Sequence, residues 1–112
     1  MDWHSETRGS ARVVAPSGEI DYPTAEDFEA RLMPEVDAAA DGGGVLVIDL
    51  KNVVHMSSVG LRVLDRALKY AEESTVKIRM AQPNPAMVDI IKITRFDKLV
   101  PVFDTVDGAV TG

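Results

Sequence analysis

Short apolar segments alternate with longer amphipathic ones along this 112-residue chain, and the alternation indicates where strands and helices lie. The run Val45-Leu46-Val47-Ile48 is apolar without alternation, which is typical of a strand buried on both faces, and we expect this strand to reach Leu50. Val76 to Met80 alternates, which predicts a strand with one wet face near an edge of the sheet. Three more strands are predicted at Trp3 to Thr7, Ala11 to Ala15 and Val100 to Phe103.

The first two of these strands form a predicted hairpin around Arg8-Gly9-Ser10. The longest amphipathic segment predicts a helix that begins at Pro23, because proline suits the first helical position. Its apolar residues recur at spacings of three and four, namely at Ala25, Phe28, Leu32, Val36 and Ala39. Pro34 lacks an N–H and crowds the preceding turn, so we expect a kink there or a helix in two pieces. Asp41-Gly42-Gly43-Gly44 ends the segment.

Three further helices are predicted behind this one. A second helix begins at Gly60, a third follows Asn84-Pro85 as N-cap and first helical residue, and a short last one covers Thr105 to Val110. The resulting order, β-β-α-β-α-β-α-β-α, predicts a single α/β domain. We expect a mixed sheet of four to five strands with about four helices packed against it.

The most informative segment joins the buried strand to the second helix and contains Ser57 and Ser58. Backbone N–H groups at a helix start point outward and favour negative charge. A hydroxyl there can be a plain helix cap, the nucleophile of a hydrolase, part of a phosphate-binding loop or a phosphorylation site. From the residues alone the cap is the favoured interpretation, and it contributes about 1 kcal/mol.

Two of these four uses are disfavoured by the neighbouring residues. An esterase elbow needs Gly-x-Ser-x-Gly for its sharp turn, whereas the chain has Met56-Ser57-Ser58-Val59-Gly60. A catalytic triad also needs a histidine. His55 is interpreted as a partly exposed loop residue, and His4 lies in the N-terminal strand region. The glycine run at 42–44 precedes a strand, and no Gly-Lys-Ser/Thr follows it, so it does not form a phosphate loop. We therefore expect no enzymatic activity.

Composition narrows the class of protein further. The formal net charge is −6 and the basic residues are scattered, which argues against binding to nucleic acids or to anionic membranes. No apolar run approaches the ~18–20 residues of a membrane span, and the N-terminus has no signal-peptide pattern. The absence of cysteine and the wide separation of the two histidines disfavour a metal site, and no cofactor is expected. We expect a cytoplasmic domain that meets proteins or small ligands.

Four segments together resemble the STAS domain, the family of bacterial anti-sigma factor antagonists and of the cytoplasmic domains of sulfate transporters. They span nearly the whole chain in the family's order. The segments are Gly18-Glu19-Ile20-Asp21 with Thr24-Ala25 behind it, Val47-Ile48-Asp49-Leu50, Met56 to Leu64, and Val102 to Val110.

In this family the best-known motif is Asp-Ser-Ser/Thr-Gly-Leu, and the first serine after Asp is phosphorylated. Alignment on Gly60 and Leu61 places that serine at Ser58, with Ser57 at the family's Asp position and Val59 at that of the second hydroxyl. The resemblance also implies that the residues around Ser58 form the phosphosite and a partner-binding surface. Those residues are Asp21, His55, Met56, Ser57, Val59, Gly60 and Leu61.

Asp21 on its own is interpreted as a cap or turn residue before the first helix. By resemblance it matches an acidic residue near the family's phosphosite, where a role in engaging the kinase is implied.

The resemblance implies an anti-sigma factor antagonist in a partner-switching pathway. The unphosphorylated domain would bind an anti-sigma factor that is also a serine/threonine kinase with a histidine-kinase-like ATPase domain, and so release a sigma factor or another target. Phosphorylation of Ser58 would add a charge of about −1.5 to −2, which a helix start tolerates and a desolvated interface does not. A PP2C-type phosphatase would reverse the step.

An alternative is motivated by Val59 and by the missing Asp. The chain is then a non-phosphorylated STAS subunit of a transporter or of a stressosome-like scaffold.

Overall fold

The computed structural model describes residues 1–112, and the expected α/β architecture is confirmed. Its elements follow the order β1 (Trp3–Arg8), β2 (Ala11–Pro16), β3 (Gly18–Ile20), α1 (Tyr22–Asp41), β4 (Val45–Asp49), β5 (Val53–Met56), α2 (Ser58–Glu73), β6 (Lys77–Ala81), α3 (Pro85–Thr94), the 3-10 turn η1 (Phe96–Lys98), β7 (Val102–Phe103) and α4 (Val106–Thr111). None of the helices combines the length and the hydropathy that a membrane-spanning helix requires.

Five strands form the main sheet in the order β1-β2-β4-β6-β7. The hairpin strands β1 and β2 pair antiparallel, and the other pairs are parallel, so the sheet is mixed as expected. Each parallel pair is joined through a helical crossover, which is the only short way to return a chain to the same end of a sheet. The strand β4 lies at the centre, which explains its unbroken apolar sequence.

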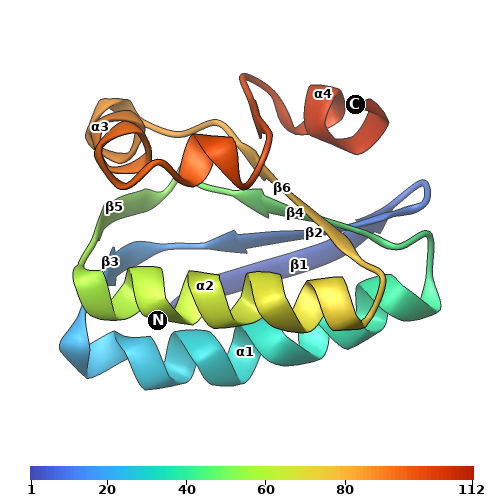
Figure 1. The fold of residues 1–112 in the computed structure, drawn as a ribbon, viewed down its shortest axis with the longest axis horizontal. Helices are drawn as coiled ribbons and strands as arrows, with labels where there is room; N and C mark the ends of the chain where they lie inside the picture. Colours follow the sequence, from blue (N-terminus) through green and yellow to red (C-terminus); the bar gives the residue numbers. More distant parts are fainter.

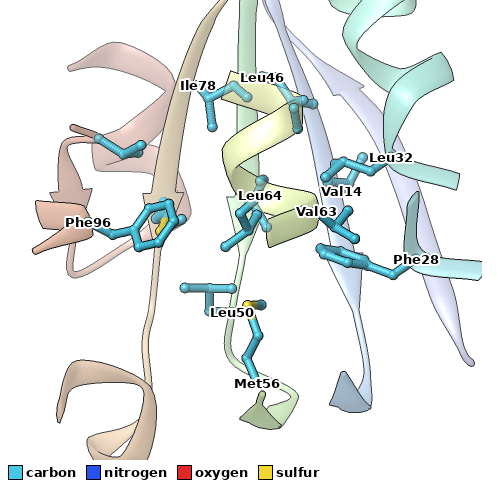
Figure 2. Close-up of a cluster of buried hydrophobic side chains, with 14 of the residues drawn as sticks. Val14, Phe28, Leu32, Leu46, Leu50, Met56, Val63, Leu64, Ile78 and Phe96 are labelled. Atoms are coloured by element: carbon cyan, nitrogen blue, oxygen red, sulfur yellow. The ribbon is translucent and has the colours of Figure 1, made fainter. Parts of the chain in front are cut away.

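Helices cover the two faces of this sheet unequally. The helices α1 and α2 lie side by side along one face, whereas the short α4 lies on the opposite side (Figure 1). The larger core fills the space between α1, α2, α3 and the sheet. Figure 2 shows side chains from α1, α2, η1 and the main sheet meeting in this core. The smaller core under α4 consists of Ala11, Val13, Val47, Ala81 and Ala109.

Polar side chains also hold α1 against α2. Arg66 on α2 donates two hydrogen bonds to Glu29 on α1, at 2.6 and 2.9 Å. This arrangement lowers the pKa of Glu29, chiefly through the hydrogen bond from the guanidinium. Further along, the Tyr70 hydroxyl donates to Asp37 at 2.5 Å, and this bond raises the pKa of Tyr70.

The helix α1 runs unbroken through Pro34, so the expectation of a helix in two pieces is wrong. Proline inside a helix costs about 3 kcal/mol, because one hydrogen bond is lost and the ring meets the preceding turn. Here the proline is on the exposed side, while Phe28, Leu32 and Val36 on the opposite side are fully buried. Burial of each such side chain contributes about 1.5–3 kcal/mol, which outweighs the local cost.

The sequence pattern also missed a two-stranded sheet made of β3 and β5. Residues 51–56 were expected to be a loop, but Val53–Met56 pairs in parallel with Gly18–Ile20. Both segments are too short to show a period. They become strands because each supplies the other's backbone hydrogen bonds, across more than thirty residues of sequence.

Candidate functional site

The small sheet of β3 and β5 brings the two segments of the candidate site together. Ile20 and Met56 end these strands and lie opposite each other in register. The next residues, Asp21 and Ser57, are the N-caps of α1 and α2. The backbone N–H of Ser57 donates to the carbonyl oxygen of Ile20 at 2.8 Å, so both helices start from one hydrogen-bonded junction.

The start of α1 is fixed by its own cap. The backbone N–H of Asp21 donates to the Thr24 hydroxyl oxygen at 3.0 Å, as in a capping box. The same hydroxyl lies 2.8 Å from the carbonyl oxygen of Glu19, to which it donates. The cap interpretation of Asp21 therefore holds, and its half-buried carboxylate is also placed at the junction that carries Ser57.

The two serines at the start of α2 differ in access. Ser57 is the N-cap, and its Oγ is buried without a hydrogen-bond partner. Ser58 is the first residue of the helix and is exposed. The helix thus begins two residues earlier than the pattern predicted, and only the second hydroxyl faces solvent.

Gly60 is buried beneath these serines, where the first turn of α2 packs closely on the small sheet. A Cβ at this position would lie 2.7 Å from Cγ of Met56 and 2.8 Å from Cγ2 of Ile20. Both of those side chains are buried in the larger core. Met56 and Gly60 therefore support the exposed residues from below, and Leu61 is also packed partly against the core.

The rest of β5 contributes exposed residues beside the junction. His55 is exposed and lies opposite Glu19 in the β3 register, so it is a strand residue and not the loop residue that the sequence indicated. Val54 exposes 60% of its surface. The sequence does not single out Val54, because two adjacent valines, Val53 and Val54, give no sign of which one points outward.

A shallow groove begins next to Ser58 and runs between α1 and α2. It encloses about 390 Å³, with Tyr22 and Val59 at one end and the ion pair of Glu29 and Arg66 at the other. Tyr22 exposes 82% of its surface, which is unusual for a large aromatic side chain. No sequence pattern indicates this groove, since it arises from the packing of two helices.

The positions of Ser58 and its neighbours determine which chemistry the site can support. An exposed hydroxyl stands at a helix start, where the first backbone N–H groups have no partner within the helix and favour an anion. Tyr22 at the start of α1 and Val54 on β5, the two elements that meet at this junction, expose apolar surface. Such a surface suits contact with another protein, and a charge added at Ser58 would sit inside that contact.

Comparison with known proteins agrees with this architecture. The crystal structure of an anti-sigma factor antagonist from Mycobacterium paratuberculosis is 34% identical with a TM-score of 0.84, over 98% of this chain and 91% of that chain. The phosphorylated form of the Bacillus cell fate determinant SpoIIAA is 14% identical with a TM-score of 0.70, over 98% and 97%.

A domain of the same fold occurs within a much larger protein. The murine anion transporter Slc26a9 is 14% identical with a TM-score of 0.80, over 95% of this chain but 18% of that chain. The family model for the STAS domain matches residues 2–109. The chain therefore belongs to the STAS domain family.

Proposed function

We propose that this protein is an anti-sigma factor antagonist that works by partner switching. In its unphosphorylated form it binds an anti-sigma factor and releases the sigma factor or other target which that partner holds. The partner is also a serine/threonine kinase with a histidine-kinase-like ATPase domain, and it transfers a phosphoryl group to Ser58. A PP2C-type phosphatase removes this group and restores binding.

The difference in access between the two serines is the observation that carries the proposal. A kinase needs the hydroxyl oxygen to reach the γ-phosphate in line, which an exposed residue at a helix start permits. Ser58 meets that requirement, whereas Oγ of Ser57 is buried. The single phosphoacceptor is therefore Ser58, although Ser57 has replaced the acidic residue of the family motif.

The surroundings of Ser58 support its role as a switch at a protein interface. Tyr22 and Val59 provide apolar contact area in the groove that begins next to Ser58, and Val54 adds exposed apolar surface on β5. When a partner covers them, a phosphate on Ser58 loses its water and meets no compensating charge, which is costly. Within the free domain the same phosphate lies at a helix N-terminus, where it is favourable. Phosphorylation thus changes binding and leaves the fold intact.

Asp21 and His55 take secondary roles in this proposal. Asp21 lies at the junction with Ser57 and presents a carboxylate close to the phosphoacceptor, where it contacts the kinase. His55 is exposed on β5 and contributes to the binding surface. Met56, Gly60 and Leu61 act by holding these residues in place. The relative from Mycobacterium paratuberculosis, itself an anti-sigma factor antagonist, supports the proposal through its 34% identity.

Incubation with the cognate anti-sigma kinase and ATP, followed by mass spectrometry of peptides, tests this function. We expect one phosphate, on Ser58, and none on the Ser58→Ala variant. Ser57→Ala is the matched control and should still be phosphorylated. Absence of phosphate on Ser58, with the kinase active on another substrate, would contradict the proposal.

The second candidate function is a non-phosphorylated STAS subunit of a transporter or a scaffold. It is favoured by the similarity to the domain of the anion transporter and by Val59, which replaces a hydroxyl residue of the motif. Such a subunit would co-purify with a membrane transporter or a large assembly, and Ser58→Asp would leave that association unchanged. Loss of the association in Ser58→Asp would instead favour the switch.

A further inference from the structure

At one edge of the main sheet, the last strand, β7, is shorter than its neighbour β6. The strand β7 contains two residues, and its pairing with β6 begins at Met80 opposite Val102. The first three residues of β6, Lys77 to Arg79, therefore have a strand beside them on the β4 side only. In a parallel ladder the residues that bond to one neighbour alternate with those that bond to the other. Because Lys77 N–H donates to Gly44 on the β4 side, the backbone of Ile78 is directed to the open side.

A groove occupies the place where a further length of strand would lie. It encloses about 590 Å³ and is the largest in the protein. Its walls come from the C-terminal half of α2 on one side and from Leu99, Pro101 and Phe103 on the other, with β6 as its floor. Leu99 exposes 64% of its surface beside it. Three residues of extended chain span about 10 Å, a length that a groove of this size accommodates.

A strand bound in this groove would contact different kinds of side chain on its two faces. Ile78 points toward the larger core, on the same side as Leu68 of α2, and these two side chains are apolar. The α2 wall also carries Asp65 and Lys69, which pair with each other at 3.3 Å, and Glu72. Lys77 and Arg79 alternate with Ile78 and also line the groove, so both β6 side chains on the other face are basic. Arg79 already donates to the carbonyl oxygen of Ala109 at 2.8 Å. Lys77 is exposed and takes part in no ion pair, although the protein as a whole carries a formal charge of −6.

We propose that this groove binds an extended peptide segment of a partner protein, in which acidic and apolar residues alternate. The segment adds to the open edge of β6 as a short strand, with main-chain hydrogen bonds to Ile78. Its apolar side chains pack toward Leu68 and Leu99, and an acidic side chain meets Lys77. The positive charge of Lys77 favours an acidic partner. The unpaired edge of β6 favours a segment with an extended backbone. The groove is separate from the Ser58 surface, so this proposal does not depend on the switch.

Binding is measured by NMR titration with an acetylated five-residue peptide that alternates valine and aspartate. We expect shift changes that centre on Lys77 to Arg79 and slower hydrogen exchange of the Ile78 amide. In the free protein that amide should exchange faster than the amide of Met80, which donates to Pro101 at 3.0 Å. A peptide that is N-methylated at the residues whose N–H groups face β6 should bind less tightly, because it cannot donate to the Ile78 carbonyl, whereas N-methylation at the intervening residues should have less effect.

Charge reversal separates recognition from non-specific binding. The variant Lys77→Glu should weaken the aspartate peptide by about tenfold or more and strengthen a lysine-for-aspartate peptide, whereas Lys51→Glu, in an exposed turn outside the groove, should change neither.

Several outcomes would overturn the proposal. Failure of both peptides to bind would mean that Lys77 merely protects an open edge from aggregation. Equal binding of both peptides would show that the charge of Lys77 does not select the partner. Self-association of the free protein in sedimentation, with the same residues shifted, would make a second copy of this chain the occupant.

Discussion

The backbone N–H of Ser57 donates a 2.8 Å hydrogen bond to the carbonyl oxygen of Ile20, and this bond joins the starts of α1 and α2. Ile20 directly precedes the N-cap of α1, and Ser57 is the N-cap of α2. The relative placement of Asp21 and Ser58 thus depends on main-chain atoms. Side chains at the site can therefore be replaced singly while the junction itself persists, which makes the site accessible to mutagenesis.

A negative charge at Ser58 should prevent binding without unfolding the protein. The variant Ser58→Asp should weaken binding to the anti-sigma partner by about 30-fold or more, because an unpaired charge in a desolvated interface costs about 2 kcal/mol or more. Its circular dichroism and thermal midpoint should match the wild type. Titration calorimetry with Ser58→Ala, which adds no charge, provides the control. Unchanged affinity of Ser58→Asp would refute the role of this residue.

Removal of the Ser57 hydroxyl should cost little, although the residue is an N-cap. A bonded cap contributes about 0.5–2 kcal/mol, but the Ser57 Oγ is buried without a partner. We expect Ser57→Ala to change the unfolding free energy by less than about 0.5 kcal/mol.

Asn84 provides the contrast to Ser57. Its side chain accepts from the Met87 N–H at 3.0 Å and also donates to the carbonyl oxygen of Val53. Asn84→Ala should therefore lower the unfolding free energy by about 1–2 kcal/mol. Urea denaturation of this variant and of Ser57→Ala, side by side with the wild type, measures both effects. Similar losses in the two variants would show that the Ser57 hydroxyl has a partner in solution.

A methyl group at position 60 should destabilise the domain. Alanine favours a helix by about 1 kcal/mol over glycine, but here its Cβ would lie 2.7 and 2.8 Å from buried carbon atoms. Overpacking of this kind costs about 1–3 kcal/mol, so the net effect of Gly60→Ala should be a loss. Gly42→Ala is the control, since its Cβ would meet nothing closer than 3.7 Å. A gain in stability for Gly60→Ala would show that α2 can shift freely.

A part-buried ion pair should contribute more to the unfolding free energy than an exposed one. Arg12 donates to Glu35 at 2.8 Å, and only 10% of the Glu35 side chain is exposed. Trp3 donates to the same carboxylate at 3.3 Å. Arg12→Ala would leave that charge with one donor and should cost about 2–3 kcal/mol. Arg31→Ala breaks an exposed pair with Asp27 and should stay within about 0.5 kcal/mol.

The contact between Glu29 and Arg66 should make part of the stability depend on pH. The pKa of Glu29 is lowered in the folded state, so its contribution is present above the ordinary glutamate pKa of about 4.3. It is lost as the pH falls through the lowered pKa. Urea denaturation should therefore show wild type more stable than Glu29→Gln at pH 7, with a gap that closes in acid. The gap should also shrink at high salt, and a gap that widens in acid would contradict the argument.

The elements that sequence predicts well are those with a complete local signal. The apolar run of β4 is central in the sheet, and Asn84-Pro85 opens α3 as expected. The hairpin of β1 and β2 is also confirmed, because its turn and alternation lie within one short segment. In each case neighbouring residues contain most of the information that decides the structure.

The features that sequence misses depend on contacts between distant segments. Pairing of β3 with β5 relies on backbone groups, which are the same for every residue type. The exposure of Tyr22 follows from how α1 packs on α2, and the burial of the Ser57 oxygen follows from the start of α2. The alignment on Gly60 and Leu61 already separates Ser58 from Ser57, but only the fold shows that the Ser57 oxygen is buried while Ser58 is exposed.

The six residues of α4 are translated after every strand that they cover. Val13 and Val47, on the second face of the sheet, therefore leave the ribosome well before their cover is available. Until α4 docks, this face of the sheet is bare apolar surface. Chaperones that bind exposed apolar surface would meet the nascent protein on this face, and docking of α4 would end their access.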